Sequence, residues 1–169
     1  MADELQEILK SEYLPNFDTF CNNLEVDVPE LNPQDRNPLL SKEDIILKRQ
    51  RAMQMSFYKY GPVYANYIRD KCMKPLEDIK IRVEKYEKTH NVEYLIDAIN
   101  FTMLGYWQRT KALVPLRESD VFVEMLKSSL TSTDVGKDIN MFLNMYNEDR
   151  DMAYFAVIGL RLRYEVQYP

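Results

Sequence analysis

The residues from Glu93 to Phe101 place polar side chains along one line of a segment that is otherwise apolar. Glu93, Asp97 and Asn100 are spaced i, i+4 and i+7, which puts them on one face of an α-helix. A helix that is apolar nearly all round is buried, and a buried carboxylate needs a cation or a hydrogen-bond donor. The segment therefore predicts a helix inside a helical bundle. The apolar residues that flank the polar line are Leu95, Ile96, Ile99, Phe101 and Met103.

A second group of carboxylates comes directly before this helix. Glu84 and Glu87 form an i, i+3 pair, and a tight turn at residues 89–91 joins the two helices. Because a short turn makes the helices antiparallel neighbours, both carboxylate pairs could face one cleft. Oxygen ligands of this kind suit magnesium or manganese. The pattern therefore predicts a hard-cation site formed by Glu84, Glu87, Glu93 and Asp97.

The same residues also fit a purely structural interpretation. Glu84 and Glu87 lie among basic residues, and a charged helix face of this kind is commonly just solvated. Asp97 and Asn100 could satisfy each other, or could pair with Arg82, as a structural polar cluster. The run 48–51 (Lys-Arg-Gln-Arg) is likewise expected to be a solvated face.

Length and composition indicate one soluble all-α domain. The chain has 169 residues, 46% hydrophobic and 29% charged, with only 4 glycines. No apolar run approaches the ~20 residues that a membrane span requires. With Cys21, Cys72 and His90 as its complete set of cysteine and histidine residues, a zinc site is not expected. Reduced cysteines and the absence of a signal-peptide pattern favour a cytoplasmic protein without membrane contact.

Charge is distributed unevenly along the chain. Residues 1–44 carry a net charge of −8, residues 45–90 carry +6, and the whole chain carries −5. An acidic protein with one basic segment is not expected to coat nucleic acid. The basic segment suits either a pocket for a small anion such as phosphate or contact with an acidic N-terminal arm.

Helical periodicity and its breaks predict a bundle of about six or seven helices. The N-terminal part (1–40) combines a helix at about 3–22 with a proline-rich linker, the core comprises 41–111, and further helices follow in 112–169. Ser41 and Asp44 form a capping-box pattern, and Pro75 suits a first helical turn. The predicted helices after the linker are 41–60, 63–73, 75–90, 92–111, 119–130, one that opens at 132–134, and 149–165.

Three elements within residues 50–107 resemble a known family. They are the run 59–61 (Lys-Tyr-Gly), the helix 76–86 with its basic residues, and the run 93–101, which ends in Asp-Ala-Ile-Asn-Phe. Together they resemble the phage-type branch of the MazG-like, all-α nucleotide pyrophosphohydrolases. The resemblance implies a helical core that dimerises and binds magnesium through Glu and Asp on neighbouring helices.

In active members, the family cleaves the α–β bond of nucleoside triphosphates and releases pyrophosphate. Carried over to this chain, Glu84, Glu87, Glu93 and Asp97 would hold the metal and act in catalysis. The substrate-binding residues would be Lys59, Arg82, Lys85 and Asn100.

This chain departs from the family pattern on its second helix. Active members have Glu-x-x-Asp on that helix, whereas here Glu93 and Asp97 are one residue further apart, and Asn100 stands where a carboxylate is wanted. Two functions therefore remain open: a magnesium-dependent nucleotide pyrophosphohydrolase, or a non-catalytic helical binding or assembly protein of phage type. In either case the apolar residues on both sides of the Glu93 line, together with the apolar face of residues 153–162, predict a homodimer or higher oligomer that buries the excess apolar surface.

Overall fold

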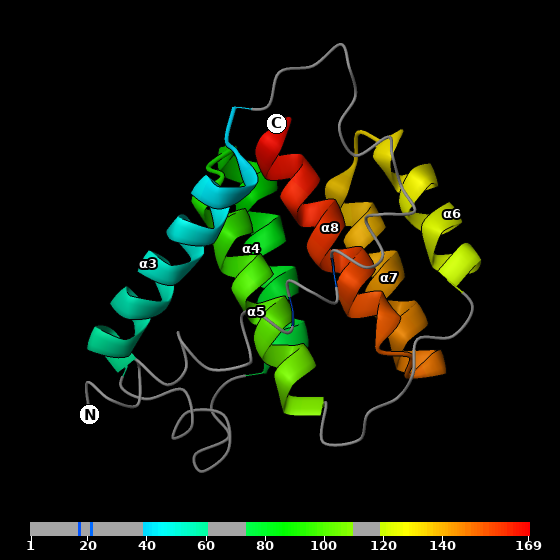
Figure 1. The fold of residues 1–169 in the computed structure, drawn as a ribbon, viewed down its shortest axis with the longest axis horizontal. Coiled ribbons are helices and arrows are strands. Elements are labelled where there is room, and N and C mark those ends of the chain that lie inside the picture. The colour runs from blue at the N-terminus through cyan, green and yellow to red at the C-terminus, as the bar shows by residue number, and fades with distance from the viewer. Residues whose placement is uncertain (1–16, 18–20, 22–38, 61–73, 110–118) are drawn as a thin grey trace.

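The computed structural model describes residues 17, 21, 39–60, 74–109 and 119–169. These residues form six α-helices and no strand, which confirms the all-α prediction (Figure 1). Apart from residues 17 and 21, the helix predicted at 3–22 lies outside the described residues, as does the helix predicted at 63–73. The helices are α3 (Lys42–Tyr60), α4 (Pro75–Thr89), α5 (Glu93–Arg109), α6 (Ser119–Leu130), α7 (Val135–Asp149) and α8 (Ala153–Gln167).

The C-terminal helix α8 lies at the centre of the bundle. It packs against α5, α6 and α7, and Figure 1 shows it between α4 and α5 on one side and α6 and α7 on the other. Every residue from 153 to 162 is buried. The chain covers this face itself, so residues 153–162 give no reason to expect a second copy, and the homo-oligomer stays a prediction.

The antiparallel pairing of α4 and α5 is confirmed, and these two helices make the most extensive contact in the described part of the chain. The turn between them depends on His90, which adopts a left-handed conformation (φ 56°) and donates its backbone N–H to the Tyr86 carbonyl. Ile79, Val83 and Tyr86, spaced i, i+4 and i+7, form the buried stripe of α4.

Capping residues set several helix boundaries where the sequence placed them. Ser41 and Asp44 exchange side-chain-to-backbone hydrogen bonds of 3.1 Å in each direction, a reciprocal capping box at the start of α3. Pro75 occupies the first turn of α4. The last boundary differs from prediction. Arg150 adopts a left-handed conformation (φ 57°) after α7, so α7 extends to Asp149 and α8 begins at Ala153 rather than near residue 149.

Helix α3 forms one edge of the described bundle and packs against α5 (Figure 1). Ile45, Arg49 and Met53, spaced four residues apart, are its buried positions. Its outward side exposes Leu47, Met55 and Tyr58. The helix is therefore amphipathic in an unusual way, with an arginine on its buried side and large apolar residues on its outer side.

A buried arginine joins α7 and α8. The Arg161 side chain is fully buried, and its guanidinium lies 3.2 Å from Asp138 Oδ2 and 2.9 Å from Glu165 Oε2. Glu165 also accepts a hydrogen bond from the Tyr86 hydroxyl of α4 at 3.3 Å. Burial and the neighbouring Glu165 raise the pKa of Tyr86 to about 12, so this hydroxyl keeps its proton at neutral pH. One cation thus links three helices.

Replacing Asp138 with alanine should destabilise the protein by about 3 kcal/mol, because it removes one partner from a buried cation. Chemical denaturation followed by circular dichroism measures the change. Glu124 provides the matched control. It lies 3.9 Å from Lys127 on an exposed surface, so Glu124→Ala should change stability by less than about 0.5 kcal/mol. Equal effects of the two substitutions would contradict this role for Asp138.

Candidate functional site

The polar line predicted on α5 is present, and it runs from solvent into the protein interior. The side chains of Glu93 and Asp97 are 56% and 39% exposed, whereas Asn100 is only 5% exposed. The apolar residues beside the line (Leu95, Ile96 and Ile99) are buried, as their periodicity predicts. The helix is thus placed as expected, and the line faces α3 and α4.

Each member of the line contacts a basic residue from another helix. Lys48 of α3 donates to Glu93 Oε1 at 3.0 Å, and the Arg82 Nε of α4 lies 3.6 Å from Asp97 Oδ2. Asn100 accepts from the Arg49 Nε at 3.2 Å and donates to the Arg49 carbonyl at 3.0 Å. We call these three contacts the α5 seam.

Arg49 was not identified as a seam residue from the sequence. The expectation of a solvated basic face holds for the exposed Arg51, but Arg49 is only 3% exposed and also lies over the Phe17 ring at 5.6 Å. The spacing of Arg49 predicts its burial, because it falls four residues after Ile45 and four before Met53, on the buried side of α3.

The carboxyl of Asp97 has a raised pKa in the folded protein. Burial raises the pKa of its carboxyl by more than the nearby Arg82 lowers it. Glu93 adds a further increase, while Lys59 and Lys85 oppose it. The 3.6 Å separation is too long for a hydrogen bond, and the buried Nε of Arg82 donates no hydrogen bond. The Arg82–Asp97 contact is therefore a loose ion pair that does not fully offset the burial of the carboxylate.

Glu84 and Glu87 lie on the exposed side of α4. The Glu87 carboxylate lies against Gly136 in the first turn of α7, where any Cβ at position 136 would overlap it. Burial, Asp134, Glu84 and Glu165 each raise the pKa of Glu87. Glu87 therefore faces α7, whereas Asp97 faces Arg82.

The four predicted metal ligands thus fall into two pairs with different surroundings. Glu93 and Asp97 act on each other beside α3 and Arg82, and Glu84 and Glu87 act on each other beside α7. Within the described ranges, no three His, Cys, Asp or Glu side chains are grouped so that they could hold a metal ion. As placed, these side chains do not fit a site built from several carboxylates, and magnesium or manganese binding stays a prediction.

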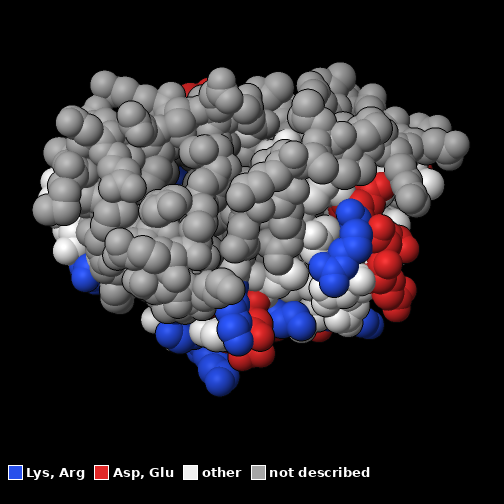
Figure 2. Space-filling view, turned by 90° about the horizontal axis from the view of Figure 1, so that it is seen from below, with Lys and Arg blue, Asp and Glu red and all other residues white. Residues whose placement is uncertain are grey.

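Of the predicted substrate-binding residues, three lie near Asp97, namely Lys59, Arg82 and Lys85. Lys85 Nζ also lies 5.8 Å from the centre of the Tyr94 ring, and the Arg82 guanidinium lies 5.7 Å from that of Phe101. The fourth, Asn100, already forms two hydrogen bonds with Arg49 through its side chain. Acidic and basic side chains are interspersed on the described part of the face in Figure 2.

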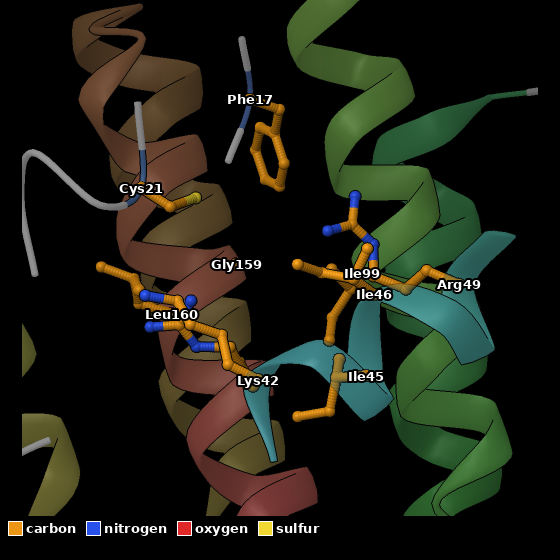
Figure 3. Close-up of a pocket in the computed structure, with 10 residues that line it drawn as sticks. Phe17, Cys21, Lys42, Ile45, Ile46, Arg49, Ile99, Gly159 and Leu160 are labelled. Carbon is orange, nitrogen blue, oxygen red and sulfur yellow. The ribbon is translucent and has the colours of Figure 1, made fainter. Parts of the chain in front are cut away.

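A small pocket between α3, α5 and α8 was not predicted (Figure 3). Besides apolar side chains it is lined by Lys42, Arg49 and Arg163, and none of the described residues that line it is acidic. Gly159 lets residues 17 and 21 approach α8, because a Cβ there would lie 2.9 Å from Phe17 Cζ and 3.4 Å from Cys21 Sγ. None of the predicted site residues lines this pocket.

Comparison with known proteins adds no assignment, since no protein-family model, curated protein or solved structure matches the chain. The described helices include none that is long and apolar enough to cross a membrane.

Asn100→Ala tests the buried end of the seam. The substitution leaves the buried Arg49 guanidinium without one acceptor, so it should cost about 1–3 kcal/mol. It should also increase amide hydrogen exchange in α3 before exchange in α7 or α8. Glu93→Gln is the matched control at the exposed end, where the loss should stay below about 1 kcal/mol. Uniformly faster exchange in all helices would contradict a local role for Asn100 in holding α3.

The pKa of Asp97 predicts how Asp97→Asn should depend on pH. Because the folded protein raises this pKa above the ordinary 3.8, ionisation of Asp97 carries a stability cost that is absent below pH 3.8 and grows as pH rises through the folded pKa. The asparagine variant lacks this cost, so its stability relative to wild type should rise over that range. Thermal melts of both proteins between acidic and neutral pH measure the difference. A difference that moves in favour of wild type would show that the Arg82 ion pair outweighs burial.

Proposed function

We propose that the protein is a non-catalytic helical assembly protein that retains a MazG-like helical core and associates with itself. The observation that carries the proposal is the α5 seam, in which Glu93, Asp97 and Asn100 each contact a basic residue of the same chain. Polar groups used in this way hold helices in one arrangement, and a buried polar or ionic contact can specify packing even where it adds little stability.

The charges of the seam support this proposal over a metal site. A carboxylate cluster that awaits a divalent cation contains like charges that repel one another until the ion binds. Here Lys48 already contacts Glu93, and Arg82 lies next to Asp97. A cation bound to this pair would have to compete with both basic residues. Glu84 and Glu87 face other surroundings and do not add to the pair.

A magnesium-dependent nucleoside triphosphate pyrophosphohydrolase is the second candidate function. One observation favours it: Lys59, Arg82 and Lys85, the three basic residues expected to hold a phosphate tail, all act on Asp97. Such a group of basic residues suits a polyphosphate, because several cations can share its charge. The proposal for this candidate rests on these residues and on the resemblance in 50–107.

The response to magnesium distinguishes the two candidates. For the assembly protein, millimolar Mg²⁺ or Mn²⁺, with or without the common nucleoside triphosphates, should leave the melting temperature unchanged and release no pyrophosphate. A ligand present at one hundred times its dissociation constant stabilises the folded state by about 2.7 kcal/mol, so specific binding would be evident as a shift. Stabilisation that needs Mg²⁺ and nucleotide together, and that Asp97→Asn abolishes, would overturn the assembly proposal in favour of the hydrolase.

A further inference from the structure

We draw no further inference here: the strongest candidate, the pocket between α3, α5 and α8 that Lys42, Arg49 and Arg163 line, carries none because each of these basic side chains already interacts with other residues of the chain, so nothing in the structure shows what ligand would occupy it.

Discussion

The described bundle depends most on a single buried cation, Arg161. A guanidinium without solvent exposure is costly to bury unless carboxylates and carbonyls take up its donors. Asp138 comes from α7 and Glu165 from the next turn of α8, so the arginine fixes how these two helices lie against each other. Glu165 extends the network to Tyr86 of α4. An apolar helix in the centre of a bundle can rotate or slide without losing much burial, whereas a buried ion pair is satisfied in one arrangement only. The network therefore specifies the packing of α8 more than it adds to stability.

The same physical device recurs at the edge of the bundle. Arg49 enters the core from α3 and is held by Asn100, as Arg161 is held by Asp138. The two contacts further out along α5 are more exposed and weaker, because solvent screens charges there. The seam thus has one buried contact, between Arg49 and Asn100, and two more exposed ones, at Glu93 and Asp97. Asp97 lies between these extremes, and burial raises the pKa of its carboxyl while the neighbouring Arg82 lowers it. Each member of the polar line thus contacts a basic residue of a helix that covers it.

Periodicity and capping signals were sufficient to predict the described helices, since α4, α5 and α6 end or begin within about two residues of their expected bounds. The polar line on α5 was also predictable, because i, i+4 and i+7 spacing defines a face. The neighbouring helix against which each face packs was not predictable from the sequence. Glu87 shares a helix side with residues expected to face α5, yet it lies against Gly136 of α7, some fifty positions along the chain. Spacing within one helix contains no information about which helix covers it.

The two buried arginines were not predicted, although their positions indicate burial. Arg49 and Arg161 each stand at an apolar position of their helix, and both are buried.

The placement of α8 also determines where any association between chains can occur. The excess apolar surface was expected beside the Glu93 line and on residues 153–162, but a bundle places its most apolar helix at the centre and surrounds it with amphipathic ones. Surface left for a partner must then lie on a peripheral helix. Among the described helices, α3 has this position, and three of its outward residues are large, apolar and exposed. Any surface for a partner therefore lies on the outer faces of the peripheral helices rather than on α8, whose residues 153–162 are buried.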